Sequence, residues 1–209
     1  GIIGSSSEDS LSTLGHLPYQ LPEGVYRLTD DASFIALLGW GLGGYRFDRY
    51  KQADRLPAQL ILPDSADAGE LVHTIKATNL SRDLINTPAQ DMAPSHLQAE
   101  VEALAETFAA EVNTTVGDEL LDLECGAIHA VGRAAADGPR LMDLTWGDPD
   151  HPKITIVGKG VTFDSGGLNM KPSSGMRWMK KDMGGAALAI GLGYRVMSQR
   201  LPIWLWMFI

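Results

Sequence analysis

Three charged residues in the last third of the chain, Lys159, Asp164 and Asp182, have the types and spacing of a metal centre. Lys159 and Asp164 follow an apolar run that predicts a strand, Lys171 comes next, and Asp182 precedes an apolar helical pattern. Carboxylate oxygens are the ligands that hard divalent cations prefer, and α/β folds place their sites at the carboxyl ends of strands. A lysine binds a cation only as the neutral amine, which neighbouring dications favour by lowering its pKa. The spacing therefore indicates a divalent-metal site.

Three other chemistries fit the sequence poorly. A phosphate-binding loop requires a glycine where Lys153 stands, and a dinucleotide fingerprint that begins at Gly158 requires one where Phe163 stands. Ser165 lies in Asp-Ser-Gly-Gly and not in the elbow motif of serine hydrolases. The five histidines lack paired ligand spacing and are expected at the surface or in packing contacts.

A purely structural interpretation of the charged residues stays open at this point. Lys159 would then be a surface residue, Asp164 a turn residue and Asp182 a helix N-cap, because Asp-Ser-Gly-Gly also favours turns.

Hydrophobic periodicity and turn residues predict the elements that position these side chains. Strands are predicted at 24–28, 59–62, 112–116, 141–146, 154–157 and 203–209, and helices at 31–47, 66–85, 95–108, 119–123, 127–135 and 183–198. Asp31 is the expected cap of the first helix, and Ser95 with Gln98 forms an expected capping box. No compact unit is expected over residues 1–29. The alternation predicts an α/β fold with a mixed, largely parallel sheet flanked by helices.

Composition limits the partners and the compartment. The 209 residues carry a net charge of −9, which argues against nucleic-acid and anionic-membrane partners, since both require clustered Lys and Arg. The longest apolar run, Ile203–Ile209, is far shorter than the roughly 20 residues that span a bilayer. Cys125 is the only cysteine, so no intrachain disulfide forms, and a reducing, cytoplasmic compartment is predicted.

The segments GKGVTFDSGG at 158–167 and MKKDMGGAA at 179–187, with Lys171 between them, resemble the leucyl aminopeptidase (cytosol aminopeptidase) family of metallopeptidases, family M17. Residues 82–89 resemble the family's entry into its catalytic domain. The resemblance covers nearly the whole chain, and its metal-site motif is highly specific. It implies a remnant of a smaller N-terminal α/β domain over 1–65, a connecting helix over 66–87 and an incomplete catalytic domain over 88–209.

The resemblance also implies a role for each motif residue. Lys159 and Asp182 would bind one of two divalent ions, zinc or manganese, and Asp164 would be shared by both. Lys171 would be the catalytic electrophile, and Met179 would line the pocket for the N-terminal side chain, with an ordinary core methionine as the alternative. The implied activity is the release of N-terminal amino acids from peptides with a free N-terminus by a metal-activated water, and the implied assembly is a hexamer.

The chain also departs from the family pattern. The family's second ligand cluster, Asn-Thr-Asp-Ala-Glu-Gly-Arg, does not occur in it, so one Asp ligand, one Glu ligand and the catalytic Arg are missing. The alternative function is therefore an inactive fragment or a structural piece of the same fold. We expect Lys159, Asp164 and Asp182 to lie within roughly 6 Å of one another. We also expect weak metal binding, and an interior fragment whose last strand, 203–209, exposes an edge prone to association.

Overall fold

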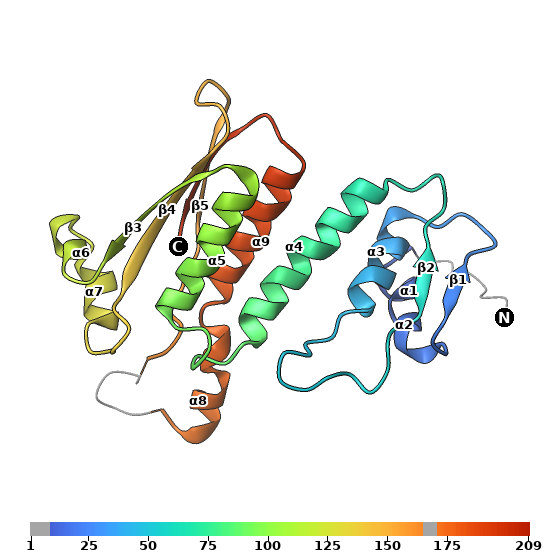
Figure 1. Ribbon diagram of the computed structural model, residues 1–209, viewed down its shortest axis with the longest axis horizontal. Helices are drawn as coiled ribbons and strands as arrows, with labels where there is room; N and C mark the ends of the chain where they lie inside the picture. The colour runs from blue at the N-terminus through green and yellow to red at the C-terminus, as the bar shows by residue number, and fades with distance from the viewer. Residues whose placement is uncertain (1–8, 165–170) are drawn as a thin grey trace. The chain divides into compact units, whose positions relative to one another are not determined.

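The structure is a computed structural model in which residues 9–164 and 171–209 are described (Figure 1). Contacts divide the chain into two compact units, Gly1–Asn79 and Leu80–Ile209. Ser165, considered above as a nucleophile, lies outside the described residues. Within the described residues, no helix is long and apolar enough to cross a membrane.

The N-terminal unit packs short helices against a central one. Its elements are α1 (Ser12–Gly15), α2 (Leu17–Gln20), β1 (Val25–Arg27), α3 (Phe34–Gly43) and β2 (Gln59–Ile61), and β1 pairs with β2 in parallel. The expectation of no compact unit over 1–29 is wrong, because Leu14 and Leu17 are buried against α3. The helices approach closely because α3 carries glycines: a Cβ at Gly39 would lie 2.0 Å from the Leu11 carbonyl oxygen.

The N-terminus of α3 corrects a second expectation. Ser33 is the N-cap residue, and its hydroxyl accepts a hydrogen bond from the Ala36 amide at 3.1 Å. Asp31 is therefore not the cap. Serine in extended backbone geometry satisfies one of the free amides of the first turn, and the helix begins after it.

The C-terminal unit contains the predicted alternation of helices and strands. Helix α4 (Ala68–Asn86) crosses from the first unit into the second. The elements that follow are α5 (Pro94–Phe108), β3 (Glu111–Val116), α6 (Glu119–Asp122), α7 (Gly126–Gly132), β4 (Arg140–Trp146), β5 (Lys153–Val157), α8 (Ser173–Trp178), the 3₁₀ helix η1 (Met179–Lys181), α9 (Gly184–Ser198) and β6 (Trp204–Phe208). The helix α8 and the 3₁₀ helix η1 were not predicted from the sequence.

Among the described residues, the sheet of this unit has the order β3-β4-β6-β5. Strand β6 runs parallel to β5, whereas β4 is antiparallel to both β3 and β6. The mixed α/β class is confirmed, although parallel pairing is less dominant in the sheet than expected. The expectation of an exposed edge at 203–209 is wrong, because β6 is hydrogen-bonded to a strand on each side.

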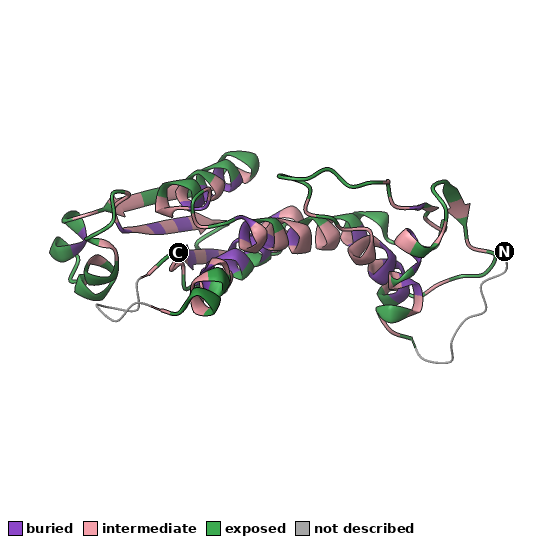
Figure 2. Cartoon of the chain, turned by 90° about the horizontal axis from the view of Figure 1, so that it is seen from below, coloured by how far each residue is buried: buried purple, intermediate pink, exposed green. Residues whose placement is uncertain are grey.

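Helices α5 and α9 cover one face of this sheet (Figure 1). Strand positions alternate between the two faces, and the buried positions face the helices. The core includes Val101 of α5, Leu144 of β4, Ile190 of α9 and Met207 of β6, each with no exposed surface. Burial is concentrated along these elements, while α6 and α7 are largely exposed (Figure 2).

The N-terminus of α5 differs from the predicted capping box. Ala93 is the N-cap residue, and its amide donates to the His96 ring at 3.1 Å. Ser95 is inside the helix, and its amide donates to Asp137 Oδ2 at 2.9 Å. Gln98 instead accepts a hydrogen bond from Arg140. A carboxylate 42 residues away in the sequence therefore satisfies a free amide of the first turn.

Candidate metal centre

The backbone between β5 and α9 positions Lys159. The Gly158 amide donates to the Phe208 carbonyl at 2.8 Å, and the Ala186 amide, in the first turn of α9, donates to the Lys159 carbonyl at 2.9 Å. A Cβ at Gly158 would lie 2.7 Å from the Ala186 Cα, and one at Gly185 would lie 2.9 Å from the Lys159 amide nitrogen. Two glycines therefore allow the strand end and the helix N-terminus to touch through their backbones.

The side chain of Lys159 contacts Asp182, which lies between η1 and α9. Its ammonium donates to the Asp182 carbonyl at 2.7 Å and to Asp182 Oδ2 at 3.2 Å. The Lys181 ammonium lies 3.7 Å from the other carboxylate oxygen, Oδ1. Asp182 follows η1, and the N-cap position of α9 is held by Met183. The interpretation of Asp182 as a helix N-cap is therefore wrong.

A second lysine–carboxylate pair joins Asp164 and Lys171, which are the described residues just before and just after positions 165–170. The Lys171 ammonium donates to Asp164 Oδ1, and both side chains are about 30% exposed. The Met179 sulfur lies 3.1 Å from the same ammonium. Met179 is buried, so the Lys171 ammonium contacts one buried sulfur and one partly exposed carboxylate.

The five residues singled out from the sequence therefore form two groups. One joins Lys159 with Asp182, and the other joins Lys171 with Asp164 and Met179. Convergence of all three proposed ligands within 6 Å stays a prediction. In the described part of the chain, no three His, Cys, Asp or Glu side chains are grouped so that they could hold a metal ion.

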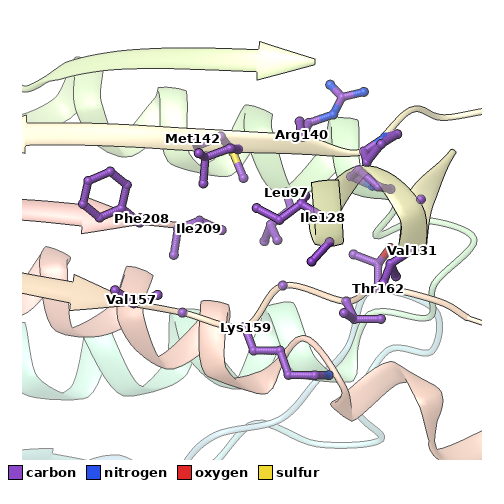
Figure 3. A pocket seen from close by; sticks show the side chains of 18 of the residues that line it. Leu97, Ile128, Val131, Arg140, Met142, Val157, Lys159, Thr162, Phe208 and Ile209 are labelled. Carbon is purple, nitrogen blue, oxygen red and sulfur yellow. The ribbon is translucent and has the colours of Figure 1, made fainter. Parts of the chain in front are cut away.

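A cavity of about 590 Å³ adjoins Lys159 (Figure 3). It lies between α7, the start of β4 and the segment after β5. The side chains of Leu97, Ile128 and Ile209 converge on it, and Lys159 and Thr162 stand at its border. Its walls are mainly apolar, so it suits an apolar group next to the polar pair.

Sequence reasoning assigned no role to two contacts of this region. Lys181 faces Asp182, and the Lys180 ammonium donates to Asn86 Oδ1, at the end of α4, at 3.3 Å. The sequence gives one signal for the first, because Lys181 and Asp182 are adjacent. It gives none for the second, since 94 residues separate the partners.

The chain matches two family models. Residues 79–209 match the catalytic domain of the cytosol aminopeptidase family, and residues 1–63 match the M17 aminopeptidase N-terminal domain. The fold and the two matches define the chain as part of an M17 aminopeptidase. It belongs to the cytosol aminopeptidase family, as the motifs at 158–167 and 179–187 indicate.

Relatives and solved structures agree with this assignment. A probable cytosol aminopeptidase of Halorhodospira halophila is 38% identical over 76% of this chain and 35% of its own length. The crystal structure of the cytosol aminopeptidase from Coxiella burnetii is 44% identical, with a TM-score of 0.90 over 97% of this chain and 46% of that one. The bottromycin maturation enzyme BotP, in complex with Mn, is 31% identical, with a TM-score of 0.81 over 95% of this chain and 47% of that one. The chain thus spans less than half the length of these proteins.

Proposed function

We propose that this chain is part of a metal-dependent aminopeptidase that releases N-terminal residues from peptides. The observation that carries the proposal is the contact between Lys159, which follows β5, and Asp182, which lies between η1 and α9, in a chain of the cytosol aminopeptidase family. An amine and a carboxylate at one point supply a nitrogen and an oxygen donor for a divalent ion.

The donors present fit such an ion in part. Lys159 and Asp182 would hold one cation, and Asp164 would be shared with a second. A hard divalent cation takes six or more oxygen ligands, so these three side chains leave coordination positions for water or for further protein ligands. The complex of BotP with Mn supports manganese as the probe metal, with zinc as the second choice.

In the proposed peptide hydrolysis, the metal ligands, Lys171 and Met179 have separate roles. When bound, a pair of divalent cations activates water and polarises the carbonyl of the scissile bond. The protonated Lys171 donates a hydrogen bond to the oxygen of that carbonyl as negative charge develops on it. Met179 and Asp164 both contact the ammonium and hold it in place, and Met179 forms one wall of the pocket for the N-terminal side chain.

The substrate class, the location and the assembly follow from the same proposal. The substrates are peptides with a free N-terminus. We place the protein in the cytoplasm, in line with the names of its relatives and its lack of cysteine pairs. We propose a homohexamer for the complete enzyme.

A direct experiment compares the 209-residue chain with a chimaera. In the chimaera, these residues replace the matching part of the Coxiella burnetii relative. Both are desalted, analysed for bound metal, and assayed with a leucine anilide in Mn²⁺ or Zn²⁺. We expect two metals and turnover in the chimaera, and weak binding or one site without turnover in the isolated chain. A chimaera that folds and binds no metal contradicts the proposal.

A second function, a noncatalytic piece with the same fold, is favoured by one observation. The described residues contain no cluster of three His, Cys, Asp or Glu side chains suited to a metal. This function predicts that the chimaera folds and assembles without turnover while the unmodified relative, measured beside it, is active. Turnover by the chimaera excludes it.

A further inference from the structure

The C-terminal end of α4 is hydrogen-bonded to η1 and to the first turn of α9. The Ser81 hydroxyl, on a buried side chain, donates to the Ala187 carbonyl at 2.9 Å. At the last residue of α4, Asn86 Oδ1 accepts a hydrogen bond from the Lys180 ammonium at 3.3 Å. All four residues belong to the unit Leu80–Ile209. One helix end is therefore joined to partners that lie 106 and 94 positions away in the sequence.

The three residues of η1 have different surroundings. Met179 is buried, and its sulfur lies 3.1 Å from the Lys171 ammonium. Lys181 is 60% exposed and faces Asp182. Lys180 stands between them, and its half-buried side chain reaches α4. The residue next to Met179 in the sequence is thus the one that ties η1 to a long helix.

The backbone around η1 gives it weak support. A 3₁₀ turn has poorer hydrogen-bond geometry than an α-helix, and here the Asp182 amide donates to the Met179 carbonyl at 2.9 Å. Every residue of the preceding helix α8, which lies wholly within the described part of the chain, is exposed or half-buried. Segments with few buried apolar contacts open locally at a low free energy. A hydrogen bond from such a segment to α4 therefore has a large share in fixing its position.

We propose that Lys180 is a positioning residue. Its hydrogen bond to Asn86 fixes η1 against the end of α4 and so holds the Met179 sulfur against the Lys171 ammonium. A charged donor makes a stronger hydrogen bond than a neutral one. The consequence for catalysis rests on the proposed function, in which Lys171 donates to the oxygen of the scissile carbonyl. A displacement of about 1 Å in such a donor lowers the rate by up to about 10²-fold.

The first test measures how often Met179 becomes accessible in the metal-free 209-residue chain. Hydrogen peroxide oxidises a methionine to the sulfoxide when its side chain opens to solvent, and peptide mass spectrometry gives the rate at each methionine. The variants are Lys180→Leu, Lys180→Arg, Asn86→Ala and the combination of Lys180→Leu with Asn86→Ala. The matched control is Lys181→Leu, which removes the same charge from the adjacent, exposed residue. Oxidation of Met207, which has no exposed surface, reports on the whole core.

We expect Met179 to be oxidised about three- to tenfold faster in Lys180→Leu and Asn86→Ala, which is the factor that one hydrogen bond of ordinary net strength contributes. The double variant should be no faster than the faster single variant, because both substitutions remove the same bond. Lys180→Arg, which restores a charged donor, and Lys181→Leu should keep nearly the wild-type rate. The rate at Met207 should be unchanged in every variant.

The second test measures catalysis by the chimaera with a leucine anilide. Lys180→Leu should lower kcat by a factor of about 10 to 10², and Lys180→Arg should recover most of it. The Michaelis constant should change less, because the proposed role of Lys180 is to position the donor that acts on the developing oxyanion.

Each contrary result overturns the inference at a different step. An unchanged rate at Met179 in Lys180→Leu means that the bond to α4 does not fix η1. A faster rate at Met207 as well means that Lys180 supports the whole fold, and an equal gain in Lys181→Leu means that charge alone acts. An unchanged kcat in the Lys180→Leu chimaera refutes the consequence for catalysis. A wild-type chimaera that folds without turnover contradicts the proposed function, and the oxidation rates then decide whether Lys180 positions η1.

Discussion

Two ion pairs of the C-terminal unit, Arg140–Asp137 and Lys159–Asp182, both join a cationic side chain to an aspartate but differ in exposure and in partners. The Arg140 side chain is 12% exposed, and its guanidinium donates to Asp137, Gln98 and the Gly138 carbonyl. Burial raises the pKa of the Asp137 carboxyl, but hydrogen bonds from Ser95 and the charge of Arg140 outweigh it, so the pKa lies below its usual value.

The pair at the candidate metal centre is more exposed. Lys159 is 60% exposed, and Asp182 has a second cation, Lys181, within 3.7 Å. The Arg140–Asp137 pair, called the closed pair below, joins α5 to β4 and is hydrogen-bonded to other protein groups. The Lys159–Asp182 pair, called the open pair below, leaves lone pairs that can be offered to a ligand. A structural ion pair is therefore recognised by protein groups that satisfy its hydrogen bonds. A functional ion pair is recognised by contacts that a ligand can replace.

The largest effect is expected from the Lys171–Asp164 pair. In the chimaera, Lys171→Ala should lower kcat by about 10²–10³ with bound metal unchanged, because a hydrogen-bond donor to the developing oxyanion is lost. Steady-state kinetics with a leucine anilide and elemental analysis check this. Loss of metal together with activity would instead make Lys171 a ligand, and Lys159→Ala, expected to lose metal, is the comparison variant.

The next largest effect is expected when the backbone contact between Gly158 and α9, which positions the Lys159–Asp182 pair, is broken. Gly158→Ala should destabilise the chain by about 1–3 kcal/mol, because its Cβ would lie 2.7 Å from backbone of α9 and the strand end must shift. Urea unfolding measures the loss. Gly160→Ala is the control, since its Cβ would meet side-chain atoms no closer than 3.4 Å. Equal stability of both variants would mean that β5 and α9 separate without loss.

The closed pair should show its role in the pH dependence of stability. At pH 7, Asp137→Asn should lower the free energy of unfolding by about 1–2 kcal/mol, because charge-assisted hydrogen bonds to Ser95 and Arg140 are weakened. The pKa of Asp137 is lowered by folding, so its contribution is present above about pH 4 and is lost as pH falls through the folded value.

The measurement is urea unfolding between pH 7 and pH 3. The difference between wild type and Asp137→Asn should narrow as the pH falls below about 4. The control is Asp118→Asn, because Asp118 is 96% exposed in its contact with His129 and should change stability little. A difference that stays constant with pH would show that the Asp137 charge is not what stabilises α5.

The smallest effect is expected when the open pair is removed without metal. Lys159→Met and Asp182→Asn should each change the free energy of unfolding by no more than about 1 kcal/mol, since exposed ion pairs contribute little. Urea unfolding of metal-free protein checks this. A loss comparable to that of Asp137→Asn would remove the distinction between the two pairs.

Hydrophobic periodicity was enough to predict the long elements. The patterns over 66–85 and 183–198 predicted helices that form as α4 and α9, and the apolar runs at 141–146 and 154–157 predicted β4 and β5. These segments are long or strongly apolar, so their local pattern predicts the element even for β5, whose Ile154 and Val157 are exposed. The motif at 158–187 likewise indicated the family before any geometry was known.

Three features were decided by contacts between distant segments. The Ser95 amide donates to Asp137, 42 residues away. The Arg140 guanidinium donates to Gln98 of α5, and β6 pairs with both β4 and β5. Short helices such as α1 and α8 carry too few residues for periodicity to show, and they are fixed by the surfaces on which they pack.

The sequence by itself determined which residue types are available for chemistry and the period of each long element, because both are local properties. Only the tertiary structure decided that Lys159 contacts Asp182 across 23 positions and that Met179 contacts Lys171. The physical reason is that an ion pair depends on distances of 3–4 Å, and those distances were set here by two glycines that let β5 and α9 touch.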